Sequence, residues 1–341
     1  MKALYYNEQK GHSGIKVGEF PVPEITDSEV LVRVRAFALN HLDVWVMGGS
    51  YAVAITLPHI FGSDASGIVE RTGKAVTHVK AGDEVVVHPG LSCGHCAACL
   101  GGQDNECSEF SVLGVVTPGV SAEYVKVPAG NVFPKPEGLS FEEAAGIGVT
   151  YTTAWNSLVL RAGIGQGETV LVQGGGSGAG TAVIQVAKLY NATVITTVGD
   201  AWKIEKARAL GADLVVNHRQ EDFLDAVKRF TRGRLADIAV DHVGGDTFAR
   251  SIAAVRRGGR IITFGATSGD EAKLSLRQVF GKNLAIHGVY VGPKAAAPQY
   301  LPLFPSKLRT VIDSVFSFDE APRAYEKLLS RQIFGKIIVT M

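Results

Sequence analysis

The pattern of hydrophobic and polar positions changes character near residue 140. Before that point, short runs rich in Val, Ile and Tyr are separated by Gly, Pro and Asp, which is typical of strands joined by turns. This pattern predicts a strand-rich, barrel-like first domain. The runs are EVLVRVRAFAL (29–39), ASGIVERTG (65–73), DEVVVHPG (83–90) and AEYVKVPAG (122–130).

After residue 140, short apolar runs alternate with stretches in which apolar residues recur every three or four positions. The first pattern is typical of buried strands and the second of amphipathic helices. Short loops between them predict a doubly wound parallel sheet, with a sixth strand near 284–292. The expected strands are 169–173, 193–198, 214–217, 237–241 and 260–265, and the expected helices are 178–189, 203–210, 223–231 and 246–255.

The tail over 319–341 predicts an amphipathic helix and a final strand that returns to the first domain. We therefore expect a first domain over 1–138 and a second over 139–285. The remaining residues, 286–341, would end the parallel sheet and rejoin the first domain. The predicted fold class is α/β.

The amino-acid composition indicates which class of partner the protein binds. Hydrophobic residues make up 46% of the 341 residues, the formal net charge is +1, and no run of like charge occurs. This excludes the electrostatic footprint of a nucleic-acid or anionic-membrane partner and favours a small-molecule substrate. The first residues lack the apolar stretch of a signal peptide, and no apolar run approaches the roughly 18 residues of a membrane span. We expect a cytoplasmic, reducing setting.

All four cysteines lie within fifteen residues and are spaced C-x2-C-x2-C-x7-C. A disulfide is one interpretation, but structural disulfides are rare where thiols are kept reduced. An iron–sulfur cluster is another, although bacterial ferredoxins run C-x2-C-x2-C-x3-C-P. Four thiolates suit tetrahedral zinc and leave no open position, which predicts one structural zinc bracing a lobe over about 90–110. The predicted ligands are Cys93, Cys96, Cys99 and Cys107.

A glycine-rich loop lies between the first strand and the first helix of the parallel sheet. In that position, small residues let the backbone approach a pyrophosphate, whose charge the helix N-terminus stabilises. A tight turn without a ligand is the alternative. The predicted dinucleotide-binding residues are Gly174, Gly175, Gly176, Ser177, Gly178, Ala179 and Gly180.

The second strand of the sheet bears on which nicotinamide is used. NAD enzymes usually place an acid at its end to hold the ribose 2′-hydroxyl, but here Asp200 falls beyond the strand end. Lys203 and Arg219 are placed to meet a 2′-phosphate, and His218 adjoins Arg219. We predict NADPH, with NADH as the alternative, since Lys203 could equally be a solvated helix residue.

Several motifs together make the chain resemble the medium-chain dehydrogenase/reductase superfamily, which includes zinc alcohol dehydrogenases and quinone oxidoreductases. The resemblance implies a GroES-like catalytic domain split around a Rossmann domain, a structural zinc in the cysteine lobe, and a homodimer or homotetramer. Substrate and nicotinamide would meet in the cleft. Besides the cysteine lobe and the glycine-rich loop, the motifs are NHLD (40–43), PHIFGSDASGIVE (58–70), GDEVVV (82–87), SFEEAAGIGVTYTTAW (140–155), ARALGAD (207–213), DHVGG (241–245) and FGKIIV (334–339).

The chain departs from the zinc alcohol dehydrogenases at the positions of one metal site. Zinc alcohol dehydrogenases hold a second, catalytic zinc, but the matching positions here are Asn40, Ser63 beside Asp64, and the apolar GIGV (146–149). Leu42 stands where a proton-relaying hydroxyl is expected. Zinc polarises a carbonyl and lowers the pKa of a bound hydroxyl, so its loss disfavours plain alcohol oxidation.

A site of this kind resembles the quinone oxidoreductase and enoyl reductase branch, which passes a hydride from NADPH to a quinone or an activated C=C. Such a protein needs to align the ring, exclude water and polarise a conjugated carbonyl. We expect Asn40 and Asp43 to be polar anchors, with Ser63 and Asp64 across from them. Both carboxylates could equally be buried structural groups. His41 and Tyr51 are candidate proton donors or substrate contacts.

The resemblance implies further cofactor contacts in loops that follow the later strands. A proline-rich segment, 292–308, stands where relatives run a helix, and we expect it to be broken because each interior proline costs about 3 kcal/mol. The implied contacts are Thr153 at the nicotinamide ribose, Val243, Gly265 and Ala266 over the ribose and adenosine, Val289 at the carboxamide and Lys336 at the 2′-phosphate.

Two other functions stay open. One is an alcohol dehydrogenase with an irregular metal site, formed from Asp64 with His41 or His59. The other is a non-enzymatic protein, either a zinc ribbon that binds nucleic acid or a cofactor-binding structural protein. The near-zero net charge argues against the ribbon.

Overall fold

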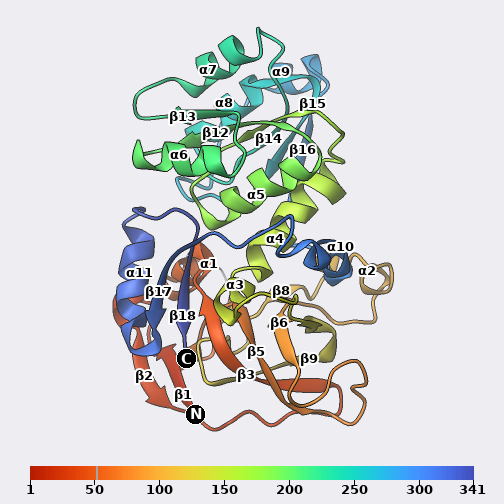
Figure 1. Ribbon diagram of the computed structural model, residues 1–341, viewed down its shortest axis with the longest axis vertical. Coiled ribbons are helices and arrows are strands. Elements are labelled where there is room, and N and C mark those ends of the chain that lie inside the picture. Colours follow the sequence, from red (N-terminus) through yellow and green to blue (C-terminus); the bar gives the residue numbers. More distant parts are fainter. Residues whose placement is uncertain (51–52) are drawn as a thin grey trace. The chain divides into compact units, whose positions relative to one another are not determined.

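A computed structural model describes residues 1–50 and 53–341 (Figure 1). The chain divides into a first unit, Met1–Thr152 with Gly292–Met341, and a second unit, Thr153–Val291. The borders therefore differ from the expected 138/139 and 285/286. Helix α3 (Phe141–Ala145) stays with the first unit because Ala145 packs against alanines and an isoleucine of that unit's sheet.

The described residues of the first unit form a seven-stranded sheet in the order β10-β6-β5-β3-β18-β17, with β9 also paired to β3. A second sheet, in the order β2-β1-β4, and the β7-β8 pair complete it. The strands are β1 (Lys2–Tyr6), β2 (Lys16–Glu19), β3 (Glu29–Ala38), β4 (His59–Ile60), β5 (Asp64–Thr72), β6 (Glu84–Val87), β7 (Gly90–Leu91), β8 (Ser111–Val112), β9 (Tyr124–Pro128), β10 (Val132–Pro134), β17 (Ile312–Ser317) and β18 (Lys336–Thr340).

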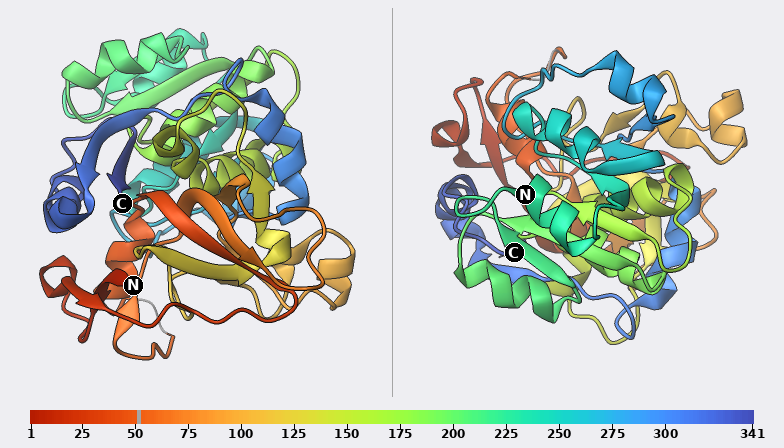
Figure 2. Two further views of the ribbon diagram at one scale, coloured as in Figure 1. Left: turned by 60° about the horizontal axis from the view of Figure 1, so that its bottom comes forward. Right: turned by 90° about the horizontal axis from the view of Figure 1, so that it is seen from above.

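The register of the central strands brings distant residues together. Ala38, at the end of β3, pairs antiparallel with Asp64 on one side and with Ile338 on the other. The C-terminal strand β18, drawn in blue, therefore lies against β3, drawn in red-orange (Figure 2). The final strand returns to the first unit, and its apolar face (Ile338) is buried on Ala36 and Ala38.

Helices of the first unit are short, and those between Gly292 and Leu308 have only three or four residues each. Prolines interrupt this segment as the sequence predicts, leaving single turns at Lys294–Ala296 and Leu301–Leu303 around α10. Among the described residues, no helix is long and apolar enough to cross a membrane. The α-helices of this unit are α1 (His41–Met47), α2 (Ala97–Leu100), α3, α4 (Gly148–Trp155, whose last residues enter the second unit), α10 (Ala297–Tyr300) and α11 (Ala321–Leu329).

The described residues of the second unit form a parallel sheet of six strands in the order β13-β12-β11-β14-β15-β16. This confirms the predicted doubly wound α/β fold, and the strand β15 starts earlier than expected because Val255 pairs with Ala236 before a register shift. The elements are β11 (Thr169–Val172), α5 (Gly178–Leu189), β12 (Thr193–Val198), α6 (Trp202–Ala209), β13 (Leu214–Asn217), α7 (Phe223–Phe230), β14 (Ala236–Val240), α8 (Asp246–Ala253), β15 (Val255–Thr263), α9 (Leu276–Gly281) and β16 (Ala285–Gly288).

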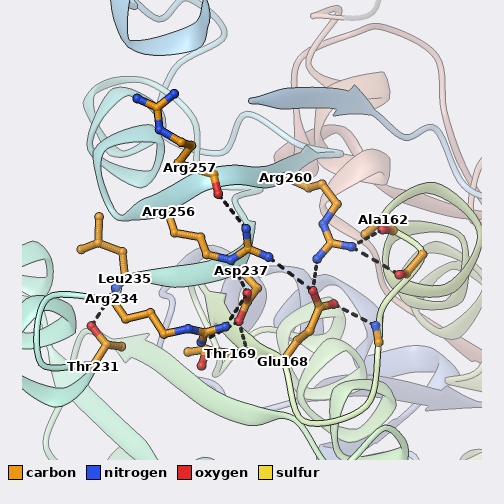
Figure 3. A network of polar contacts seen from close by, with 12 residues as sticks. Ala162, Glu168, Thr169, Thr231, Arg234, Leu235, Asp237, Arg256, Arg257 and Arg260 are labelled. Atoms are coloured by element: carbon orange, nitrogen blue, oxygen red, sulfur yellow. Dashed lines mark hydrogen bonds and ion pairs between the residues drawn. The ribbon is translucent and has the colours of Figure 1, made fainter. Parts of the chain in front are cut away.

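A polar network ties the amino ends of three of these strands together (Figure 3). The buried Asp237 of β14 accepts hydrogen bonds from the Thr169 N–H of β11 (2.7 Å), from Arg234 (2.9 Å) and from Arg256 of β15. Burial raises the pKa of Asp237, but these donors outweigh it and hold the pKa below its usual value. The network lies at the amino ends of these strands, whereas the glycine-rich loop follows the carboxyl end of β11, so the network stabilises the sheet away from that loop.

Candidate functional site

The four cysteine side chains converge. Their sulfur atoms all lie within 4.8 Å of one another, and the closest pairs are 3.5 to 3.8 Å apart. Four ligands about 2.3 Å from a tetrahedral zinc would lie about 3.8 Å apart, whereas a disulfide would need about 2.05 Å. The residues therefore fit one zinc ion with four sulfur ligands.

The surroundings of the sulfurs favour a thiolate at Cys93, whereas the neighbouring sulfurs and burial outweigh the Cys99 N–H and raise the pKa of Cys96 to about 11. Backbone N–H groups of His95 and Cys96 lower the pKa of Cys93 to about 6. The N–H of Glu109 donates to the Cys107 sulfur at 3.4 Å. Helix α2 and the turn at Asp104–Glu106 position the last three cysteines.

A partly buried ion pair ties the cysteine lobe to the proline-rich segment. The Lys294 ammonium lies 2.7 Å from one oxygen of Asp104, and the Lys294 backbone N–H donates to the other at 2.9 Å. The same ammonium donates to Ser92, next to Cys93, at 2.9 Å. The lobe is therefore fastened at both ends within the first unit.

The glycine-rich loop leads directly from β11 into α5. Ser177 caps α5 and accepts the Gly180 N–H at 2.9 Å. Gly174 has a φ of +66°, and a Cβ at Gly175 would lie 2.0 Å from the Thr196 hydroxyl. These close approaches exclude larger side chains and form a cradle for a pyrophosphate.

The helix end completes this cradle. The N–H groups of Gly178 and Ala179 have no acceptor within α5, because the first turn of any helix lacks them. Together with the helix dipole they stabilise an anion. Gly176 precedes the cap, so the loop predicted from sequence lies at the carboxyl end of β11, as a dinucleotide requires.

One residue that sequence reasoning missed packs on this loop. The His242 ring stacks on Phe264 at 5.0 Å, and its Nε2 lies 3.0 Å from the Ser177 hydroxyl. Burial lowers the pKa of His242 to about 4, so the imidazole is neutral. Its position beside Val243 in DHVGG was the available signal. The predicted contacts Val243, Gly265 and Ala266 lie in the loops after β14 and β15, where Val243 O accepts the Ser268 N–H.

At the end of β12, two cations share one acid. Arg219 donates to Asp200 at 2.6 Å, and the Lys203 ammonium lies 3.6 Å from the other oxygen of Asp200. Lys203 is 8% exposed, so it is not an ordinary solvated helix residue. The His218 ring lies beside Gly199, where a Cβ would be 3.3 Å from its Nε2.

Two further predicted cofactor contacts are buried. Thr153 is the first residue of the second unit and lies on α4. The Val289 N–H donates to the Thr263 carbonyl at 2.8 Å, so only its carbonyl is left to meet a carboxamide.

A second polar cluster, which we call the Asn40 corner (Asn40, Asp64 and Lys336), forms where β3, β5 and β18 meet. Asn40 caps α1, two residues after the Ala38 pairings. Its Nδ2 donates to Asp64 Oδ2 at 2.9 Å, and its Oδ1 accepts from the Lys336 ammonium at 2.8 Å. All three side chains are at least nine-tenths buried.

Lys336 uses its three donors inside this corner. It donates to Asn40 Oδ1, to Asp64 Oδ2 at 3.0 Å and to the Leu39 carbonyl at 2.8 Å. This arrangement does not fit the expectation that Lys336 reaches a 2′-phosphate, because each N–H already has an acceptor.

Asp64 is held on its other side by the start of α4. Its Oδ1 accepts the Val149 N–H at 2.6 Å, and a Cβ at Gly148 would lie 2.3 Å from the same oxygen. A carboxylate at a helix N-terminus is favoured by the helix dipole. GIGV therefore serves to bind Asp64 and supplies no metal ligand.

Asp43 is a buried structural carboxylate, as the alternative interpretation holds. It accepts the Asn40 backbone N–H at 2.9 Å and the Tyr325 hydroxyl of α11 at 3.0 Å. Burial raises the pKa of Asp43 to about 7. It fixes the backbone of Asn40 and does not reach outward.

The remaining candidates do not assemble a metal site. The Ser63 hydroxyl donates to Leu113 O at 2.8 Å, and His59 Nε2 bonds Gly114 O at 3.0 Å. The His41 ring packs edge-on against Trp45, and burial lowers its pKa. Within residues 1–50 and 53–341, the convergent groups of three or more potential ligands all include Cys93, and none includes Asp64. Tyr51 lies outside the described residues.

These residues do not fit a catalytic zinc. An amide and a hydroxyl replace the soft ligands that zinc prefers, and the remaining carboxylate is already paired with an ammonium. The irregular site formed from Asp64 with His41 or His59 is not built either. No step of chemistry is therefore routed through a second metal.

Family models match both units. Residues 26–137 match the alcohol dehydrogenase GroES-like domain, and residues 178–306 match the zinc-binding dehydrogenase domain. Similar curated proteins include the alcohol dehydrogenase of Geobacillus stearothermophilus, 32% identical with 99% of each chain covered. The human quinone oxidoreductase is 26% identical, with 100% of this chain and 98% of that protein covered.

Solved structures are similar over the whole chain. A structure described as an NAD-dependent alcohol dehydrogenase is 42% identical, with a TM-score of 0.96 and full coverage of both chains. The 2-octenoyl-CoA carboxylase reductase CinF, in complex with NADP and 2-octenoyl-CoA, is 30% identical with a TM-score of 0.90, covering 99% of this chain and 87% of that one. From its two domains, its cysteine lobe and these similarities, the chain belongs to the medium-chain dehydrogenase/reductase superfamily and is an oxidoreductase of that family.

Proposed function

We propose that this protein is an NADPH-dependent reductase that transfers a hydride to a quinone or an activated C=C, including enoyl-CoA thioesters, without a catalytic zinc. The observation that carries the proposal is the Asn40 corner. There, the acid that would adjoin a catalytic metal is bound by the protein's own ammonium. The CinF structure, which binds NADP and an enoyl-CoA, supports the substrate class.

A bound dihydronicotinamide would supply the hydride. In the proposed reaction the hydride adds to the β-carbon of the conjugated substrate, the C=C pair shifts to the bond between the α-carbon and the carbonyl carbon, and the carbonyl π pair moves onto the oxygen. Water then protonates the α-carbon of this enolate and leaves as hydroxide. Asn40 is the residue we assign to the carbonyl oxygen, since its amide N–H can stabilise the charge that develops there.

The proposed preference for NADPH depends on Lys203 and Arg219, which both lie beside the end of β12. A 2′-phosphate would offer them a more highly charged partner than a ribose hydroxyl. Asp200 competes for both cations, so NADH is accepted as the weaker cofactor.

A second candidate function is alcohol oxidation. It is favoured by the 42% identity to the NAD-dependent alcohol dehydrogenase. This function would need a second metal, which metal analysis detects independently of any substrate.

We also propose that the protein is a homodimer or homotetramer. Leu276 and Phe280 of α9 are 71% and 69% exposed, and Ile286 of the following edge strand β16 is 39% exposed. Exposed apolar side chains and an open sheet edge both favour self-association. Four free thiols gathered for a metal suit a reducing compartment such as the cytoplasm.

The test is to follow NADPH and NADH oxidation against quinones, enals, enoyl-CoA thioesters and simple aldehydes. We expect turnover of conjugated substrates, with NADPH preferred. Activity confined to simple aldehydes, with NADH preferred, would contradict the proposal in both respects.

A further inference from the structure

We propose that Lys336 is a positioning residue that orients the Asn40 amide so that one N–H is offered to the substrate carbonyl. This inference rests on the role given to Asn40 in the proposed function. It assigns a specific task to a lysine that the resemblance had linked to the cofactor.

The orientation of the amide follows from its partners. An ammonium can only donate, so the group 2.8 Å from Lys336 must be the carbonyl oxygen Oδ1. A carboxylate only accepts, so the group 2.9 Å from Asp64 must be the amide nitrogen Nδ2. Lys336 and Asp64 together therefore exclude the flipped amide.

This orientation leaves one donor. Nδ2 carries two hydrogens, and one is bound to Asp64. In the part of the chain that the structure describes, the second hydrogen of Nδ2 has no protein acceptor. Asn40 as a residue is 8% exposed, and we assign this remaining N–H to the substrate oxygen.

The backbone of Asn40 is fixed as well. Its N–H donates to Asp43, which also accepts from Tyr325 of α11. Tyr325 and Lys336 both belong to the C-terminal return of the chain. Elements near the C-terminus therefore hold Asn40 in two ways. Tyr325 acts on its main chain through Asp43, and Lys336 binds its side chain.

Lys336 also makes Asn40 a better donor. A positive charge hydrogen-bonded to an amide oxygen draws electron density from the nitrogen, and linked hydrogen bonds strengthen one another in a buried site. The ammonium therefore acts on the substrate oxygen through the amide without touching it.

A purely structural lysine would neutralise Asp64 and do nothing more. The positioning role and the structural role predict different kcat values for a variant that lacks Lys336 but remains folded. Lys336→Met alone leaves the buried Asp64 carboxylate without its cation and is expected to destabilise the chain strongly, so the informative variant is Lys336→Met with Asp64→Asn, which removes both charges.

The experiment measures kcat, KM and the NADPH dissociation constant for this double variant in the full chain, alone and combined with Asn40→Ala. We expect the double variant to remain folded and to lose about tenfold or more in kcat, since one oriented donor is worth about 100-fold or more. NADPH binding, followed by nucleotide fluorescence, should be unchanged. In the Asn40→Ala background the double variant should cause no further loss, because Lys336 acts through Asn40.

A matched control is Lys294→Met with Asp104→Asn, which removes a comparable lysine–aspartate pair from the same unit. It should lower stability and leave kcat unchanged. Lys336→Arg should retain more activity than the double variant, because Arg can still donate to Oδ1. A stable double variant with normal kcat, or losses from Lys336 and Asn40 that simply multiply, would overturn the inference.

The outcome is separable from that of the proposed function. If the wild-type enzyme reduces only simple aldehydes, the proposed function fails. The same set of variants then tests Lys336 on the aldehyde carbonyl, since that oxygen also accepts a hydrogen bond.

Discussion

The cysteine lobe and the Asn40 corner are two polar clusters of one structural unit that satisfy their negative charge in opposite ways. In the lobe, sulfurs 3.5 to 3.8 Å apart fit an external zinc ion. In the corner, the ammonium of Lys336 lies 3.0 Å from Asp64 and is built into the chain. The difference teaches that one structural unit can balance negative charge in two ways. One cluster uses a metal ion taken from solution, and the other uses an ammonium group of the chain itself.

The largest effect is expected from loss of the metal. Cys107→Ser removes one of four ligands, and a structural zinc contributes its binding energy directly to folding. We expect about 3 kcal/mol or more of lost stability and a Tm lowered by about 6 °C or more, measured by calorimetry with zinc analysis. The folded fraction should keep its kcat. Loss of turnover at normal stability would assign chemistry to the lobe.

The corresponding change in the corner should be nearly as severe. Lys336→Met leaves Asp64 buried and unpaired, and breaking such a pair costs about 3–5 kcal/mol. Combining Lys336→Met with Asp64→Asn should restore most of the lost free energy of unfolding, whereas adding zinc to Lys336→Met should restore none of it. Denaturant unfolding of the three proteins measures this. Rescue of Lys336→Met by zinc would erase the distinction between the two clusters.

Protonation of the neighbouring Asp43 sharpens the comparison, because among the residues that the structure describes its carboxyl forms no ion pair, and it accepts only from the Asn40 N–H and the Tyr325 hydroxyl. Its pKa is raised to about 7 by burial, against about 3.9 in the unfolded chain. The folded state therefore holds the proton more tightly, and the associated stability is present below about pH 4 and is lost as the pH rises to about 7. Asp43→Asn should flatten this slope between about pH 4 and pH 7 in unfolding experiments. An equally steep slope in the variant would place the titration elsewhere.

The smallest expected effect concerns the second unit. There, Asp200 pairs with Lys203 and Arg219, the two cations that we propose to bind the 2′-phosphate of NADPH. Asp200→Asn releases Arg219 and Lys203 from their shared carboxylate. We expect NADPH to bind about three- to tenfold more tightly, which corresponds to about 1 kcal/mol for partly exposed pairs. Fluorescence titration measures this, and Glu205→Gln, which removes an exposed pair on the same helix, is the control. Tighter binding of NADH alone would contradict it.

The parts that sequence predicted are those set by local pattern. The cysteine spacing, the glycine-rich loop between β11 and α5, and the alternation of the parallel sheet each depend on neighbouring residues. The structure divides the chain after Thr152 and not after 138, and this difference involves Ala145, which packs on strands far away in sequence. Lys336 was assigned to the cofactor, since nothing local shows that Ile338 pairs with Ala38. His242 was missed because its stacking on Phe264 is a tertiary contact.

The central claim is that the corner supplies its own cation while the lobe takes one from solution. The zinc content of the purified wild-type protein, compared with Asp64→Asn and Cys107→Ser, tests this most directly. The account predicts one zinc per chain in the wild type and in Asp64→Asn, and a marked loss in Cys107→Ser. Two zinc ions per chain in the wild type, with one lost in Asp64→Asn, would contradict it.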